Sequence, residues 1–225
     1  MKGQEELHAD YTKRVVVDTG SATFVRSPAR GVWRKRLELL GDSEQGRVTS
    51  VVRYDPGSRF PSHGHPAGEE ILVLEGVFSD ERGDFPAGSY QLNPSGFRHA
   101  PFSERGCLLF VKLRQYAGQG RELVLRNTRR GTWIDRRIPG VQSLPLYESR
   151  QHGENIRLTR FQPGARAPRI DLPDGQELFV ISGALEDEHG TYSSGTWLRM
   201  PKGSHHCPGS PEGCVLYVKT GGFPC

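Results

Sequence analysis

The chain alternates short runs of apolar residues with segments rich in glycine, proline, aspartate and serine. In the first half, runs rich in β-branched and aromatic residues occupy residues 48–54, 70–78, 89–93 and 107–113. Runs of this kind, bounded by turn-forming residues, are typical of β-strands. The polar segments 79–84 and 186–191 each predict a hairpin turn. No segment keeps a 3.6-residue apolar period over twelve or more residues, so the pattern predicts an all-β fold.

The second half of the sequence repeats the first after a shift of 107 residues. Residues 53–112 align with residues 160–219 without a gap, and 24 of the 60 aligned positions are identical. Upstream, residues 23–32 resemble residues 132–141 with a slightly larger offset. A tandem duplication of a strand-rich unit predicts two antiparallel β-barrels. We expect an N-terminal extension over residues 1–20, a first barrel over residues 21–126 and a second barrel over residues 127–225.

Two sequence blocks of the first half place histidine and glutamate at regular distances from turn glycines. The first block, residues 57–76, has the form G-x5-H-x-H-x3-E-x6-G. The second block, residues 88–99, has the form G-x5-P-x-G-x2-H. His63 and His65 are two residues apart, so on a strand both imidazoles point to the same face. This spacing predicts paired ligands.

Two further residues complete the predicted ligand set. Glu69 begins the following strand and shares its face with the apolar Ile71. His99 follows a Pro-Gly turn that can direct its side chain inward. Glu70 is the rival carboxylate, but it lies on the opposite face. We therefore expect His63, His65, Glu69 and His99 to bind one divalent metal ion, Zn²⁺ first and Fe, Mn, Ni or Cu as alternatives.

The second copy has lost most of these ligands. In place of the first three ligands it has residues that coordinate metals poorly or not at all, in order Ile170, Leu172 and Gln176. Only His99 is matched by a histidine, His206. We expect this barrel to be retained for packing. The alternative is an altered pocket for an organic ligand, or a redox-sensitive Cys207 beside His206.

Composition and charge exclude several classes of protein. The formal charge of +4 and the pI near 9.0 allow nucleic-acid binding, but the basic segment 126–137 contains an aspartate and no nucleic-acid motif accompanies it. No apolar run approaches 18 residues, and the polar N-terminus lacks the apolar stretch of a signal peptide. We expect a cytoplasmic protein without direct contact to nucleic acid or membrane. Four cysteines without CxxC spacing are expected to be free thiols.

The two blocks resemble the signature motifs of the cupin superfamily, and the duplication resembles a bicupin. HGHPAGEEILVLEGVFSDERGDFPAGSY, followed by NPSGFRH and GC, is similar to the cupin domain of ChrR-type anti-sigma factors. The resemblance implies a jelly-roll (double-stranded β-helix) barrel in each half and zinc at His63, His65, Glu69 and His99. ChrR-type factors also carry a helical N-terminal domain with a zinc-binding His-x3-Cys-x2-Cys motif, which this sequence does not contain.

Three functions follow from this resemblance as hypotheses. The first is a regulatory module that senses an oxidant or a small ligand, with an extracytoplasmic-function (ECF) sigma factor or another regulatory protein as its partner. The second is a metal-dependent dioxygenase that cleaves diketones or flavonols. In that case Arg98 and Tyr90 are the first catalytic candidates, and Arg59, Phe97 and Phe102 lie near the same motifs. The third is a structural bicupin stabilised by its metal. A homodimer is also possible on general grounds.

Overall fold

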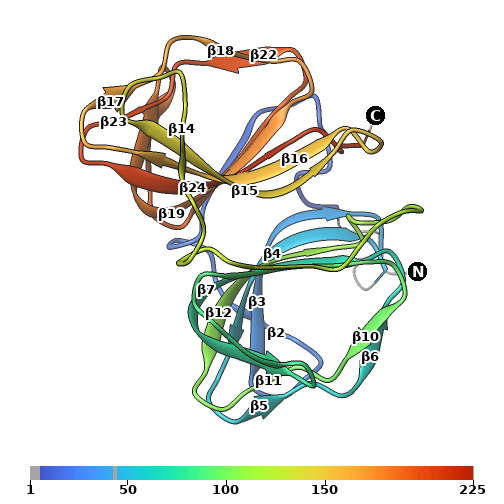
Figure 1. Ribbon diagram of the computed structural model, residues 1–225. Coiled ribbons are helices and arrows are strands. Elements are labelled where there is room, and N and C mark those ends of the chain that lie inside the picture. The colour runs from blue at the N-terminus through green and yellow to red at the C-terminus, as the bar shows by residue number, and fades with distance from the viewer. Residues whose placement is uncertain (1–5, 43–44, 225) are drawn as a thin grey trace. The chain divides into compact units, whose positions relative to one another are not determined.

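The computed structural model describes residues 6–42 and 45–224, which contain β-strands, turns and loops but no α-helix. Contacts divide the chain into two compact units. The first contains the residues up to Ala9 together with Thr23–Arg130, and the second contains Asp10–Ala22 together with the residues from Gly131 onward. The predicted all-β fold with two tandem cupin barrels is confirmed (Figure 1). The described residues include no helix that is long and apolar enough to cross a membrane.

The first unit is built around a ten-stranded antiparallel sheet. Its main path runs β13-β9-β7-β12-β4-β3-β2, with β5, β8 and β11 attached at its side, and β10 and β6 form a separate two-stranded sheet. The strands are β2 (Val25–Arg26), β3 (Val32–Leu40), β4 (Arg47–Tyr54), β5 (Ser58–Arg59), β6 (His63–His65), β7 (Glu69–Asp80), β8 (Gly83–Pro86), β9 (Ser89–Asn93), β10 (Phe97–His99), β11 (Phe102–Ser103), β12 (Cys107–Leu113) and β13 (Val124–Asn127).

The second unit repeats this topology strand by strand. Its main path runs β1-β21-β19-β24-β16-β15-β14, with β17, β20 and β23 attached at its side, and β18 and β22 form the second two-stranded sheet. The strands are β1 (Val15–Asp18), β14 (Ile134–Asp135), β15 (Val141–Ser149), β16 (Glu154–Phe161), β17 (Ala165–Arg166), β18 (Ile170–Leu172), β19 (Gln176–Asp187), β20 (Gly190–Ser193), β21 (Thr196–Met200), β22 (Ser204–His206), β23 (Gly209–Ser210) and β24 (Cys214–Thr220).

Each unit is completed at one sheet edge by a short strand. β1, which lies in the predicted N-terminal extension, pairs with β21 in the second unit, and β13, which spans the predicted boundary between the barrels, pairs with β9 in the first unit. An unpaired sheet edge accepts a strand that offers matching hydrogen bonds, wherever that strand lies in the sequence. The compact units change at residues 9/10, 22/23 and 130/131, whereas the boundaries at residues 20/21 and 126/127 stay predictions.

The apolar runs become central strands because their side chains alternate between two covered faces. β12 lies between β7 and β4, and Leu109 and Val111 join Ile71 and Val73 in the buried core of the first unit. A bulge interrupts this pairing near Gly76, whose φ is +72°. A Cβ atom there would lie 2.1 Å from the carbonyl oxygen of Gly106, so only glycine fits. The repeated glycine of the sequence motif is therefore a requirement of the barrel.

Candidate metal centre

His63 and His65 lie at the two ends of β6 and face the interior of the first barrel. Gly64 between them is exposed, which matches the two-residue alternation expected of a strand. The Nδ1 atom of His63 lies 2.8 Å from the carbonyl oxygen of Pro61. Because a carbonyl only accepts hydrogen bonds, Nδ1 carries the hydrogen and Nε2 keeps its lone pair. His63 is thus prepared to bind a cation through Nε2.

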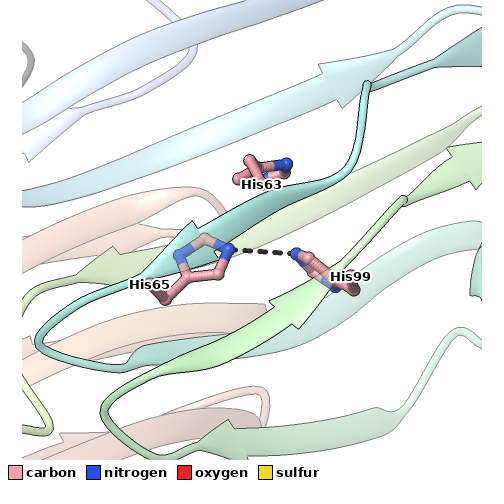
Figure 2. Close-up of side chains that lie close together, drawn as sticks. All are labelled: His63, His65 and His99. Atoms are coloured by element: carbon pink, nitrogen blue, oxygen red, sulfur yellow. Dashed lines mark hydrogen bonds between the residues drawn. The ribbon is translucent and has the colours of Figure 1, made fainter.

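His99 is brought to the same place by the pairing of β10 with β6. The register sets His99 opposite His63 and Phe97 opposite His65. The backbone N–H of Phe97 donates to the carbonyl of Pro94, which closes the turn that leads into β10. His99 is 2% exposed, and its Nε2 lies 3.0 Å from Nε2 of His65 (Figure 2). One ligand atom from each of the three histidines lies within 4.8 Å of the others.

Glu69 stands at the first position of β7 with its carboxylate in the same cluster. Its Oε2 atom lies 3.5 Å from Nε2 of His65 and 3.5 Å from Nε2 of His99. The side-chain amide of Asn93 donates to the same oxygen over 3.1 Å. The structure therefore brings all four residues of the predicted ligand set into one group, in which His63 is partly exposed and the other three are buried.

The electrostatic surroundings keep the imidazoles of His63 and His65 neutral. Burial, reinforced by the neighbouring His99 and His63, lowers the pKa of His65 to about 3. Burial also lowers the pKa of His63, although the hydrogen bond to Pro61 opposes the change. Burial raises the pKa of Glu69, against the effects of His99 and Asn93. Neutral imidazole is the form that binds metals, so two of the three histidines are held in the binding form at neutral pH.

Three of the four donors, on His65, His99 and Glu69, are spaced as ligands of a tetrahedral divalent cation are, and the ligand atom of His63 lies within 4.8 Å of those of the other two histidines. Zn–N and Zn–O bonds of about 2.0–2.1 Å at the tetrahedral angle separate two ligand atoms by about 3.3 Å. The distances of 3.0, 3.5 and 3.5 Å among His65, His99 and Glu69 bracket this value. In the structure the Nε2 atoms of His65 and His99 share a hydrogen bond, and a cation bound at their centre would take the place of the hydrogen between them. Such an ion would be held by these four residues.

A cavity of about 300 Å³ adjoins the cluster within the first barrel. All four predicted ligands contribute to its wall, and the remaining wall is largely aliphatic and aromatic, including Val32, Val52, Phe60, Phe78, Leu109 and Val111. A pocket with a few polar groups at one end and apolar walls is typical of small-molecule sites. The space beside the cluster can therefore admit a small apolar molecule.

The proposed catalytic candidates lie outside this cluster. Tyr90 is fully buried, and its hydroxyl donates to Glu70 over 3.0 Å, so both side chains point away from Glu69. Arg98 is exposed on β10, where its side chain lies over Gly64 on the outer face. Arg59 pairs with Glu104 at the surface and stacks on Phe102. Among the described residues, no hydrogen bond is found from these side chains to the three histidines. The ring of Phe97, by contrast, lies 5.3 Å from that of His99.

Sequence reasoning did not single out Asp80 and Arg82, which surround the cluster. Nδ1 of His99 lies 3.4 Å from Oδ2 of Asp80, at the end of β7. Arg82, in the adjoining turn, donates to both Asp80 oxygens and to the side chains of Gln91 and Asn93. The hairpin over residues 79–84 is confirmed, but its charged residues were attributed to the turn alone. The repeat offered a signal, because Asp80 is retained as Asp187.

The second barrel fills the equivalent place with apolar side chains. Ile170 and Leu172 on β18 pack with the core of the second unit. Gln176 is buried at the start of β19, and His206 is buried on β22. Nδ1 of His206 lies 3.8 Å from Oδ2 of Asp187, beyond hydrogen-bonding distance. Within the part of the chain that the structure describes, His, Cys, Asp and Glu side chains gather as a possible metal site in the first barrel alone.

Comparison with known families identifies the family of this chain. The model of the ChrR cupin-like domain matches this chain twice, over residues 12–117 and residues 121–224. The chain belongs to the ChrR cupin-like family. The resemblance predicted from the two sequence blocks is thereby confirmed, and both matches begin upstream of the barrel strands, at the edge strands β1 and β13.

One curated relative of this ChrR cupin-like chain is the anti-sigma-E factor ChrR of Cereibacter sphaeroides. The two are 42% identical over 98 residues, which is 44% of this chain and 42% of the relative. The alignment thus spans less than half of the relative's length.

Solved structures share the fold over nearly the whole chain. A "putative dioxygenase" from Nostoc punctiforme superimposes with a TM-score of 0.79 at 15% identity, covering 92% of this chain and 82% of that one. Protein Ylba from E. coli gives a TM-score of 0.72 at 14% identity, with 97% and 95% covered. Oxalate decarboxylase of Bacillus subtilis gives 0.66 at 13% identity, with 95% and 78% covered. At these identities the comparisons establish the bicupin fold and nothing finer.

Proposed function

We propose that the first barrel binds one divalent metal ion through His63, His65, Glu69 and His99. The observation that carries this proposal is the convergence of three imidazole nitrogens within 4.8 Å, with the Glu69 carboxylate 3.5 Å from two of them. Three imidazole nitrogen donors and one carboxylate suit first-row divalent ions, and Zn²⁺ is our first choice. Bound there, the ion would supply a positive charge and an acceptor for further ligands.

We propose that this metal-loaded barrel is the sensory part of a cytoplasmic regulatory module. Membership of the ChrR cupin-like family supports the proposal, because a relative at 42% identity is an anti-sigma factor. The cavity of about 300 Å³ supports it as well, since a small oxidant or ligand can reach the ligand side chains through it. An ECF-type sigma factor is the proposed partner, and a change at the metal would alter the contact with that partner.

A metal-dependent dioxygenase is the second candidate, and the apolar wall of the cavity favours it. A diketone or flavonol has a chelating pair of oxygens on an apolar body, which matches a metal beside aliphatic and aromatic side chains. The residues of this chain would then orient the substrate and exclude water. Oxygen consumption with a β-diketone or a flavonol, measured on protein loaded with Fe²⁺ or Cu²⁺, distinguishes this candidate from a sensor.

Elemental analysis of the purified protein tests the metal proposal. We expect about one metal ion per chain, reduced to a small fraction by His99→Ala, because loss of one donor from four leaves an incomplete coordination shell. His206→Ala is the matched control in the second barrel, and we expect it to keep the full metal content. Unchanged metal content in His99→Ala would overturn the assignment.

Co-purification with a candidate sigma factor tests the regulatory part. We expect the metal-loaded protein to retain the sigma factor and His99→Ala to bind it less tightly. Oxygen consumption by the wild type together with no sigma-factor binding would overturn the regulatory proposal in favour of the enzyme.

A further inference from the structure

The His99 ring is fixed from behind by a carboxylate. Its two nitrogens have different surroundings: Nε2 faces His65 and Glu69, whereas Nδ1 faces Oδ2 of Asp80 at 3.4 Å. A carboxylate accepts hydrogen bonds, so the hydrogen resides on Nδ1 and the lone pair on Nε2 points to the ligand cluster. A ligand histidine whose second nitrogen donates to a carboxylate is better oriented and more basic.

Asp80 is itself held rigidly by Arg82. The guanidinium donates to both carboxylate oxygens, with the shortest contact at 2.5 Å, and the Arg82 backbone N–H donates to Oδ1 over 2.8 Å. The Asp80 side chain is completely buried. The hydrogen bonds from Arg82 therefore hold the carboxylate in place behind His99.

The same arginine connects His99 to a second ligand. Arg82 also donates to Oδ1 of Asn93 over 3.2 Å, and the amide of Asn93 donates to Oε2 of Glu69 over 3.1 Å. A continuous chain of hydrogen bonds thus runs from His99 through Asp80, Arg82 and Asn93 to Glu69. Two of the four proposed ligands lie at its ends, so the chain fixes their mutual orientation.

We propose that Asp80, clamped by Arg82, is a positioning residue that sets the orientation and basicity of His99 for metal binding. The inference rests on the metal-binding function proposed above. The second barrel lacks the connection: Asp187 is retained, but His189, Leu198 and Met200 replace Arg82, Gln91 and Asn93. Asp187 instead receives hydrogen bonds from Arg14 and Tyr192, and it lies 3.8 Å from His206. The chain of hydrogen bonds is therefore found in the barrel that has the four proposed ligands.

Zn²⁺ competition titrations on the full chain test this inference. We expect Asp80→Ala to weaken Zn²⁺ binding about 10- to 100-fold, as outer-sphere changes do in other metal sites. Asp80→Asn keeps the size of the side chain and one acceptor oxygen, so we expect a smaller loss than in Asp80→Ala. A loss remains, because one oxygen cannot accept from His99 and Arg82 at once. Asp187→Ala is the matched control, and we expect its Zn²⁺ affinity to equal that of the wild type.

A spectroscopic measurement separates positioning from a general loss of structure. At saturating Co²⁺ we expect the visible absorption of Asp80→Asn to be shifted, because the His99 ring is turned, while thermal unfolding of the metal-free variant stays near the wild type. Equal Zn²⁺ affinity in the wild type and both Asp80 variants would overturn the inference, and so would an equal loss in Asp187→Ala. A wild type that binds neither Zn²⁺ nor Co²⁺ would instead overturn the metal-binding function itself.

Discussion

The two barrels share one topology but use the same interior position in opposite ways. In the first barrel β6 supplies His63 and His65 to a polar cluster beside a cavity of about 300 Å³. In the second barrel the equivalent strand β18 supplies Ile170 and Leu172 to the apolar core. The strands, their registers and the glycine at the bulge are the same in both. The same scaffold is therefore completed by apolar packing in one barrel and by a polar cluster in the other.

The retained residues of the second barrel sharpen this comparison. His206 and Asp187 remain buried near each other, although the other ligand positions are apolar or amide. Burial of a histidine beside an aspartate is thus compatible with the fold alone. What distinguishes the first barrel is the set of converging donors and the hydrogen-bond chain behind them.

The largest expected effect is the gain of a metal site in the second barrel. In the triple variant Ile170→His, Leu172→His and Gln176→Glu, the new donors lie on β18 and β19 beside the resident His206. We expect a second Zn²⁺ ion per chain, because the register of β18 with β22 is that of β6 with β10. Calorimetric titration with Zn²⁺ measures the stoichiometry.

Leu172→His alone is the control for this transplant, since two histidines without the carboxylate make an incomplete site. It should take up no additional zinc. A folded triple variant with the wild-type stoichiometry would show that side-chain identity at these positions is insufficient.

Removal of the metal should destabilise one barrel and leave the other unchanged. At free Zn²⁺ a thousand-fold above Kd, binding adds about 4 kcal/mol to the free energy of unfolding of the barrel that holds the ion. Hydrogen exchange measured with and without a chelator should show faster exchange for β7 and β12 but no change for β19 and β24. Equal acceleration in both barrels would contradict an independent role for the first site.

A smaller effect is expected from Tyr90→Phe, which tests a contact that both barrels share. Tyr90 donates to the buried Glu70, and Trp197 donates to the buried Glu177 at the equivalent position. Because the pair occurs in both barrels, we expect it to serve stability. Loss of the hydroxyl should lower the free energy of unfolding by about 1–3 kcal/mol and leave Zn²⁺ affinity unchanged, as measured by urea unfolding and titration. Weaker zinc binding without loss of stability would make Tyr90 part of the site.

Much of this structure could be predicted from the sequence because it follows from local spacing. The strands over residues 89–93 and 107–113 are found at the predicted positions, since turn residues delimit them on both sides. The shared inward face of His63 and His65 was predictable, because the two-residue alternation of a strand decides which side chains share a face.

What the sequence could not supply depends on registers between distant strands. Tyr90 lies opposite Leu72, and this pairing turns its hydroxyl toward Glu70, away from the histidines. Residues 15–18 form the edge strand β1 against β21, which no local pattern indicates. The contact of Asp80 with His99 likewise joins the end of β7 to β10, nineteen residues away.

The smallest expected effect is that of replacing Arg98, a neighbour of His99 in the sequence that faces away from it in space. Arg98 is next to His99 in the chain, but strand alternation places it on the outer face of β10, as it places His205 on the outer face of β22. We expect Arg98→Ala to change the free energy of unfolding by no more than about 0.5 kcal/mol and Zn²⁺ affinity by less than about twofold, with His205→Ala as the matched control. A tenfold loss of Zn²⁺ affinity in Arg98→Ala alone would mean that the outer face of β10 communicates with the cluster. The inward-facing side chains would then not be enough to explain why the first barrel binds Zn²⁺ and the second does not.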